Sequence, residues 1–293
     1  MLDDMNAPTV DIVTISFADA ERFPTFLAAL REFDYPADRI RLVVVDNDSS
    51  DGALPYLRSN LGELPFAAEL IEAGQNLGFS GGCNRGAAAG TSDYILFLNA
   101  DTFAHRDMVR RLVERAEREP KAGLLEAHQY PHELRKLVDS ATGRTDWCSG
   151  AALLARRSAF EAVKGFDEIF YPAYCEDVDL SWRMWLAGWM CVFEPGAVVR
   201  HDTMEPGAVE KPLEKLLTTQ FSFVMHFIYD SSRGFLIHLI RGFRYLISHR
   251  TDSVRRRGVA KGLSLLIRKM PELIARRRAA RSAIAGSNET ERF

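Results

Sequence analysis

The chain has 293 residues, of which 47% are hydrophobic and 26% are charged, and its formal net charge is -3. A chain of this size can bury a large core, and one domain with an appendage is the expected organisation. The slightly negative charge excludes a general nucleic-acid binder, which needs a basic surface. Charge is unevenly distributed along the chain: the segment from Arg233 to Arg281 contains 14 Lys and Arg residues and only two acidic residues.

The cysteines and the lengths of the apolar runs indicate in which cellular compartment the protein resides. Cys83, Cys148, Cys175 and Cys191 have no metal-ligand spacing, and the acidic start of the chain does not resemble a signal peptide. No apolar run approaches the roughly 20 residues that span a bilayer. These features predict a reduced, cytoplasmic protein.

Strands and helices alternate along the first hundred residues. Apolar runs predict strands at 10–17, 41–45, 68–72 and 94–98, and helical spacing predicts helices at 22–33, 54–60 and 83–89. Such alternation predicts an α/β fold with a doubly wound, mostly parallel sheet. Ligands of these sheets bind at the carboxyl ends of the strands.

The strand at 94–98 ends in Asn99-Ala100-Asp101. Oxygen-bearing side chains two residues apart at a strand end can point together at a hard cation such as Mg²⁺ or Mn²⁺. A turn or a helix cap explains the same residues structurally, because Asn and Asp are common in turns. His201 ends a predicted strand at 197–202 and could join such a metal site, although a lone His is more often a simple hydrogen-bonding residue.

Asp46 follows the second predicted strand and opens a polar cluster at 46–52. A carboxylate at this position can accept a hydrogen bond from the N3 proton of uracil or thymine. The alternative is a strand-to-helix turn with Ser50 or Asp51 as the cap.

Residues 75–86 contain four glycines and two asparagines and are expected to form a loop before a helix. Glycines allow a ligand to approach the backbone, and helix N-terminal amides favour a diphosphate, so Asn76, Gly78, Gly82 and Asn84 are candidate donor-binding residues. The segment is neither a Walker loop nor a dinucleotide fingerprint. Tight-turn chemistry is the alternative.

Glu176, Asp177 and Asp179 begin a predicted amphipathic helix. The helix dipole stabilises negative charge there, which accounts for one or two acids. Three carboxylates in four residues repel one another, so at least one is expected to have another task, such as that of a general base. Asp177 is the candidate.

The order of these clusters resembles a known family. The matching segments are DNDSSDG (46–52), QNLGFSGGCNRG (75–86), FLNADT (97–102), WCSGAALLARR (147–157), GFDEIFYPAYCEDVDLSWR (165–183) and His201. Together they resemble the inverting glycosyltransferases of family 2, which have the GT-A fold, and among them the rhamnosyltransferase-like enzymes of bacterial polysaccharide assembly. The resemblance covers about residues 9 to 205.

The resemblance implies a role for each matching residue. It implies that Asp46 contacts the base, Asp177 of the Glu176-Asp177 pair is the catalytic base, and Asp101 and His201 bind Mn²⁺ or Mg²⁺. It further implies that Trp147 to Gly150 line the donor or acceptor pocket. Asn99 stands where many members have an Asp, so it is expected either to orient the donor sugar or cap the turn, or to touch the metal.

The implied reaction is a single displacement at the anomeric carbon. The donor would be a dTDP or UDP sugar, the transferred sugar would be rhamnose or a related hexose, and the acceptor would be a saccharide or a lipid-linked saccharide. Two other functions are alternatives. A sugar-nucleotide nucleotidyltransferase should carry a Gly-rich, basic loop after the first strand, where Ser16-Phe17-Ala18-Asp19 stands here. A non-catalytic nucleotide-sugar-binding protein should have lost the three acids.

Residues 211–293 are expected to form a basic, aromatic-rich helical extension with a polar tail, separate from a catalytic domain at 1–210. Apolar stripes and arginines between 221 and 281 suit peripheral contact with an anionic membrane on the inner face of the cell membrane. Packing against the catalytic domain or against a second subunit in a homodimer is the alternative.

Overall fold

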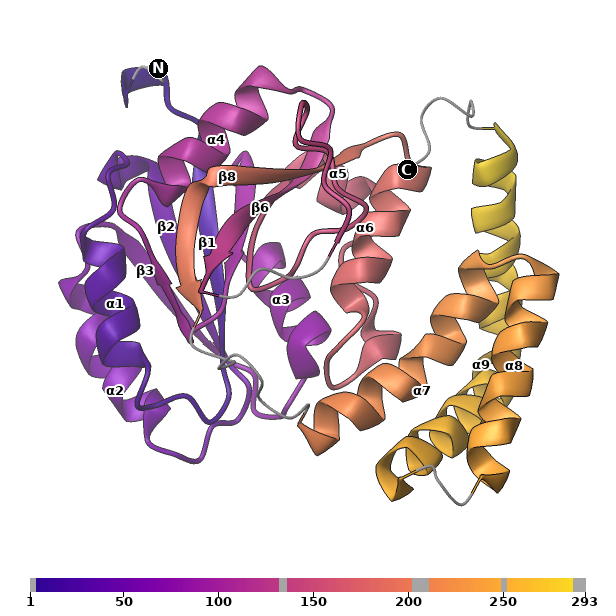
Figure 1. The fold of residues 1–293 in the computed structure, drawn as a ribbon. Coiled ribbons are helices and arrows are strands. Elements are labelled where there is room, and N and C mark those ends of the chain that lie inside the picture. Colours follow the sequence, from indigo (N-terminus) through magenta and orange to yellow (C-terminus); the bar gives the residue numbers. More distant parts are fainter. Residues whose placement is uncertain (1–3, 132–135, 202–210, 249–251, 287–293) are drawn as a thin grey trace.

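The structure of the protein, a computed structural model, describes residues 4–131, 136–201, 211–248 and 252–286. These residues form an eight-stranded sheet with helices on both faces, followed by three long helices beside it (Figure 1).

The elements alternate along the first part of the chain and become helical at the end. The strands are β1 (Val10–Ser16), β2 (Ile40–Asp46), β3 (Ala67–Glu72), β4 (Tyr94–Leu98), β5 (Thr102–Ala104), β6 (Ala122–Tyr130), β7 (Ala152–Arg156) and β8 (Met190–His201). The helices are α1 (Phe23–Arg31), α2 (Ala53–Asn60), α3 (Gly78–Ala88), α4 (Met108–Arg118), α5 (Arg157–Ala162), α6 (Glu176–Leu186), α7 (Pro212–Tyr229), α8 (Ser232–Ile247) and α9 (Ser253–Gly286). Short 3-10 helices are η1 (Asp4–Asn6), η2 (Ala37–Arg39), η3 (Leu61–Glu63) and η4 (Glu168–Phe170).

The sheet has the strand order β3-β2-β1-β4-β7-β6-β8-β5. The four strands predicted in the first hundred residues are β1 to β4, and their pairings are all parallel. Strand β7 is antiparallel to β4 and β6, and β5 is antiparallel to β8. The predicted α/β fold with a mostly parallel sheet is therefore confirmed, with two antiparallel strands in its second half.

Alternate residues of the central strands belong to two different cores. Ile12 and Leu96 pack with α1, α2 and α4, whereas Val13 and Phe97 pack with α3, α5 and α6. Successive side chains of a strand point to opposite faces, so a strand buried on both faces reads as a continuous apolar run. Figure 1 shows α1 and α2 on one side of the sheet and α3 and α6 on the other.

Helix α3 begins earlier than expected, because the glycine-rich segment is helical from Gly78 rather than a loop. The Asn76 side chain accepts a hydrogen bond from the Gly78 N–H at 2.8 Å, which satisfies one free donor of the first turn. Gly78 has φ +70, and a Cβ there would lie 2.7 Å from the Pro172 carbonyl oxygen. Only glycine fits this contact.

The C-terminal helices share a third core with the first part of the chain. Phe221 of α7 packs on Phe170 of η4 with ring centroids 5.3 Å apart, and Leu273 of α9 is fully buried in the same cluster. Tyr229 at the end of α7 donates a hydrogen bond to Asp179 of α6 at 2.7 Å. Helices α7 and α9 therefore pack against α6, as one of the two alternatives for this region expects.

None of the helices in the described ranges combines the length and the apolar composition that a bilayer-spanning segment needs.

Candidate functional site

The predicted strand-end residues gather at one edge of the sheet. Ser16 and Asp46 pair at the carboxyl ends of β1 and β2, and Asn99 and Asp101 follow β4, which pairs with β1 in parallel. Because parallel strands end together, the sheet topology brings side chains from three strands to one place.

Asp46 is buried, with 3% of its surface exposed. The Ser49 N–H donates to its Oδ2 at 3.3 Å, while its Oδ1 has no hydrogen-bond partner in the part of the chain that the structure describes. The Oδ1 of the neighbouring Asn47 also lacks a partner, although its amide nitrogen donates to the Gly78 carbonyl at 3.0 Å. Buried polar atoms are normally paired, so such unpaired acceptors at the end of β2 are suited to a ligand that donates hydrogen bonds.

Asp101 and His201 face each other across the end of β5 and β8. His201 Nε2 lies 3.4 Å from Asp101 Oδ1, and Arg22 Nη1 forms an ion pair with Asp101 Oδ2 at 2.7 Å. Burial acts to raise the pKa of Asp101, but His201 and Arg22 outweigh it and hold that pKa below its usual value. The carboxylate is therefore ionised at neutral pH.

The donor atoms of Asp101 and His201 fit a divalent cation. His201 Nε2 is buried and has no hydrogen-bond partner within the described ranges, while Nδ1 lies 2.7 Å from Gln129 Oε1. Carboxylate oxygen and imidazole nitrogen are both ligands of Mn²⁺. Among the residues that the structure describes, no group of three or more His, Cys, Asp or Glu converges as a complete metal site.

Asn99 contributes to the strand end through its backbone. Its N–H donates to the Ala151 carbonyl at 2.9 Å, and its carbonyl accepts from the Thr102 N–H at 3.1 Å and from the Thr102 hydroxyl at 2.6 Å. This turn connects β4 to β5. Because β5 pairs with β8, it places Asp101 opposite His201. A ligand contact by the Asn99 side chain remains a prediction.

The three acids at the start of α6 have different surroundings. Asp179 is buried and forms an ion pair with Arg183 at 2.7 Å, so it has a structural task. Glu176 is buried with its Oε2 unpaired, and burial followed by the nearby Asp177 charge raises its pKa well above the usual value. Asp177 is partly exposed, and burial raises its pKa although the backbone N–H groups of Gly150 and Val178 act against this.

The segment 149–151 joins the parts of the site. The Ser149 N–H donates to Glu126 Oε2 at 2.7 Å, and the Gly150 N–H donates to Asp177 Oδ2 at 3.2 Å. The Ala151 carbonyl accepts a hydrogen bond from the Asn99 N–H. Three consecutive residues span about 7 Å. The predicted base and the strand end that carries the predicted metal ligand are thus held by the same short stretch of backbone.

Three of the predicted donor-binding residues in and before α3 make contacts within the fold. The Asn76 side chain caps the first turn, and a Cβ at Gly82 would meet Ile15 Cδ1 at 2.8 Å. The Asn84 amide donates to the Phe166 carbonyl and accepts from the Phe166 N–H, both at 2.9 Å. These contacts dock α3 on the sheet and on the chain before α6, and donor binding here remains a prediction.

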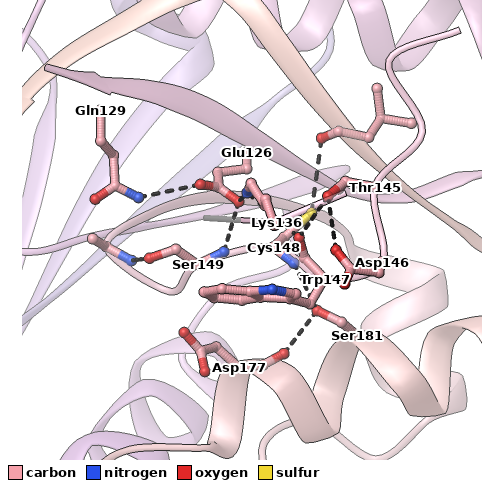
Figure 2. Close-up of polar contacts among 12 residues, drawn as sticks. Glu126, Gln129, Lys136, Thr145, Asp146, Trp147, Cys148, Ser149, Asp177 and Ser181 are labelled. Carbon is pink, nitrogen blue, oxygen red and sulfur yellow. Dashed lines mark hydrogen bonds and ion pairs between the residues drawn. The ribbon is translucent and has the colours of Figure 1, made fainter. Parts of the chain in front are cut away.

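Trp147 lies beside a buried ion pair that the sequence reading did not include. Lys136 pairs with Glu126, and both side chains are less than 5% exposed. The Lys136 ammonium is 5.2 Å from the centre of the Trp147 ring. Figure 2 shows the Trp147 ring between Glu126 and the Asp177 carboxylate in that view.

The sequence patterns do not predict a role in this region for four residues, namely Arg22, Glu126, Gln129 and Lys136. A sequence signal exists for Glu126, which interrupts the apolar run of β6 after Leu125. Charged residues are almost never fully buried unless they are paired, so a Glu within a core strand indicates a partner elsewhere. The identity of that partner was not readable, because Lys136 approaches from outside the strand.

Residues 11–145 match the family model described as Glycosyl transferase family 2. An N-acetylglucosaminyl-diphospho-decaprenol L-rhamnosyltransferase of Mycobacterium tuberculosis is 28% identical over 237 residues, which cover 65% of this chain and 75% of that protein. Rhamnosyltransferase WbbL of Escherichia coli (strain K12) is 51% identical over 43 residues, which are 15% of this chain and 16% of WbbL.

Solved structures show the same fold. The mannosyltransferase PcManGT from Pyrobaculum calidifontis, in complex with GDP-Man and Mn²⁺, superposes with a TM-score of 0.65 at 20% identity over 99% of this chain and 79% of that chain. S. aureus TarS 1-349 in complex with UDP-GlcNAc gives a TM-score of 0.59 at 14% identity, over 96% and 93% of the two chains. At these identities the likeness concerns the fold alone. The family match over residues 11–145, the rhamnosyltransferase relatives and the shared fold together support a glycosyltransferase of family 2 that is similar to rhamnosyltransferases and has the GT-A fold.

Proposed function

We propose that the protein transfers rhamnose or a related hexose, with inversion, from a dTDP or UDP sugar to a saccharide or lipid-linked saccharide of the bacterial envelope. The relatives named as rhamnosyltransferases support this, one of them acting by its name on a diphospho-decaprenol substrate. The observation that carries the proposal is the attachment of Asp177 and Asn99 to the same segment, 149–151. It brings an acceptor-activating carboxylate beside the strand end that would hold the donor.

Asp177 would accept the proton of the acceptor hydroxyl as that oxygen attacks the anomeric carbon. The leaving nucleoside diphosphate departs from the opposite face, so the configuration inverts. A raised pKa suits this role, because a base works best when its pKa approaches the working pH. The Gly150 N–H fixes the carboxylate, and Trp147 and Gly150 would line the reacting end of the pocket.

Asp101 and His201 would hold Mn²⁺ or Mg²⁺, with the remaining ligands drawn from the donor diphosphate and water. When bound, the cation would neutralise the negative charge that grows on the leaving diphosphate. Arg22 already pairs with Asp101 and adds positive charge on the same side. Asp46, with its unpaired Oδ1, would accept the N3 proton of uracil or thymine. The unpaired Glu176 and the amides of Asn76, Gly78, Gly82 and Asn84 are the further donor contacts proposed.

We also propose a cytoplasmic enzyme that touches the inner face of the membrane through its helical extension, residues 211–293. Helix α8 supports this, because it carries a row of exposed apolar side chains, Leu236, Ile237, Ile240, Phe243 and Ile247, each at least 50% exposed. Exposed arginines flank the row. A homodimer through the same face is the alternative occupant.

The test of the proposed reaction is the variant Asp177→Asn, which keeps the size of the side chain and removes the base. Loss of a general base costs about 10²- to 10⁴-fold, so transfer to the acceptor should fall by about that factor. Binding of the nucleoside diphosphate, measured by calorimetry with Mn²⁺ present, should remain. Asp38→Asn removes a carboxylate whose side chain is 80% exposed and is the matched control. Normal turnover by Asp177→Asn would remove Asp177 from this role.

A further inference from the structure

A chain of buried hydrogen bonds runs from Lys136 to the predicted metal ligand His201. Lys136 donates to Glu126 Oε2, and Gln129 Nε2 donates to Glu126 Oε1 at 3.2 Å. Gln129 Oε1 lies 2.7 Å from His201 Nδ1. Figure 2 shows the side chains of Lys136, Glu126 and Gln129.

The direction of each hydrogen bond is fixed by the one before it. An ionised carboxylate can only accept, and Glu126 takes donors from Lys136, from Gln129 and from the Ser149 N–H. The amide of Gln129 must therefore turn its NH₂ group to Glu126 and its oxygen to His201. Because that oxygen can only accept, the proton of a neutral His201 ring must reside on Nδ1.

The consequence falls on His201 Nε2. With the proton on Nδ1, Nε2 carries a free lone pair. This atom is buried, lies 3.4 Å from Asp101 Oδ1 and has no hydrogen-bond partner among the residues that the structure describes. A lone pair is the state that a metal ligand needs, whereas a proton on Nε2 would block coordination. Groups behind a ligating His commonly fix its tautomer in this way.

The strand pairing explains why these residues meet. Gln129 of β6 pairs with Val199 of β8, so His201, two residues further on, projects from the same face. In a regular strand Glu126 and Gln129 would point to opposite faces. The β6–β8 register shifts between Ala127 and His128, and this irregularity allows the two side chains to meet.

We propose that Glu126, held as a carboxylate by Lys136, orients the Gln129 amide so that His201 keeps its proton on Nδ1 and offers Nε2 to the divalent cation. Gln129, Glu126 and Lys136 act through His201 and are therefore positioning residues. The proposal rests on the metal site of the proposed function.

The first experiment reads the tautomer of His201 in the metal-free protein by ¹⁵N NMR. Wild type should show a protonated Nδ1 and an unprotonated Nε2. Gln129→Met, which keeps the length of the side chain but removes the amide, should lose this preference. Mn²⁺ affinity, measured by calorimetry with the nucleoside diphosphate present, should fall about 10- to 100-fold, as is usual for loss of a group behind a metal ligand. Gln220→Met, the same change in α7, is the matched control and should alter neither reading.

The second experiment uses Lys136→Met, a change three hydrogen bonds away from His201. Burial already raises the pKa of Glu126, and the Lys136 ammonium acts against this, so without Lys136 the buried carboxyl should take up a proton. A protonated Glu126 can donate to Gln129, which allows the amide to turn its NH₂ group to His201. The His201 proton should then move to Nε2, and Mn²⁺ affinity should fall as in Gln129→Met.

A merely structural role for Gln129 predicts no change of tautomer in Lys136→Met, provided that circular dichroism and thermal unfolding report a folded protein. A wild-type Nε2 that carries the proton, or a Gln129→Met protein with unchanged tautomer and affinity, would overturn the proposal. Failure of the metal site itself looks different. In that case wild type binds no Mn²⁺ with the nucleotide, while the Nδ1 tautomer and its response to Lys136→Met persist.

Discussion

At the scale of single residues, partners decide which of the neighbouring acids is available for chemistry. Asp179 is paired with Arg183 and Tyr229, and Glu176 is buried with a strongly raised pKa. Asp177 is the acid of this group that is partly exposed, and it receives a hydrogen bond from the 149–151 segment. A turn that gives Tyr174 and Cys175 positive φ values precedes it, and such backbone strain is frequent at functional sites.

The raised pKa of Asp177 predicts the pH dependence of transfer. Only the ionised carboxylate can accept the acceptor proton, so kcat/KM should fall as the pH falls through the pKa of Asp177. Because burial raises that pKa, the fall should begin at a higher pH than for an ordinary Asp, whose pKa is about 3.9. Steady-state rates at saturating donor measure the profile. Calorimetric donor binding over the same range separates the base from donor release, and a flat profile down to acid unfolding would contradict the assignment.

At the scale of elements, contacts distant in sequence decide where a helix starts. Helix α3 begins at Gly78 because its first turn docks on the chain before α6. The Phe79 N–H donates to the Pro172 carbonyl at 2.7 Å, and the Asn47 amide donates to the Gly78 carbonyl at 3.0 Å. The start of α3 thus connects the end of β2 to the segment that leads into the predicted base.

Gly78→Ala and Gly74→Ala should separate backbone strain from this close contact. Both glycines have φ near +70, but a Cβ at Gly74 meets nothing within 4 Å, whereas at Gly78 it would lie 2.7 Å from the Pro172 oxygen. We expect Gly74→Ala to lower the free energy of unfolding by about 1 kcal/mol, the cost of a left-handed residue with a side chain. Gly78→Ala should cost at least about 2 kcal/mol more, because the start of α3 must move. Urea unfolding measures both, and equal losses would show that the contact is unimportant.

At the scale of the whole molecule, the C-terminal helices separate into a packed part and an exposed part. Helices α7 and α9 cross closely, since a Cβ at Gly258 or Gly262 would lie within 2.8 Å of the α7 backbone. Both help bury the core shared with α6 and η4. Helix α8 keeps its apolar row exposed. Packing, one of the two alternatives for this region, is therefore seen in α7 and α9. Membrane contact through α8 stays a prediction.

The exposed row of α8 should bind anionic membranes. Changing Leu236, Ile240 and Phe243 together to Gln should reduce co-sedimentation of the full-length protein with phosphatidylglycerol vesicles by at least about 10-fold, because each buried apolar side chain contributes about 1.5 to 3 kcal/mol. Ile267→Gln, on α9 and also exposed (74%), is the control and should bind normally.

Ionic strength provides a second test, because about 1 kcal/mol for each nearby Arg should be lost as salt screens the charges. Equal binding by the triple variant and wild type would reject membrane contact through α8. Concentration-dependent self-association of wild type, abolished in the triple variant, would instead assign the row to a dimer.

Strands β1 to β4 and the acids that follow them could be predicted from the sequence alone, and the order of the motifs indicated a family resemblance. Strands β1, β2 and β4 are buried on both faces, so they read as apolar runs whatever packs on them, and each polar residue that follows such a run must lie at the sheet edge. Asp46, Asp101, Asp177 and His201 were predicted in this way or from the order of the motifs. Local pattern sufficed because each signal resides within a few consecutive residues.

Only the tertiary structure decided which groups act on one another. Gln129 reaches His201 through the pairing of β6 with β8, and the 149–151 segment connects Asp177 to Asn99 across strands far apart in the chain. The helical start at Gly78 depends on Pro172, 94 residues away. Hydrogen bonds and ion pairs act over a few ångströms, so their partners are set by sheet order and register, which periodicity within one segment does not encode.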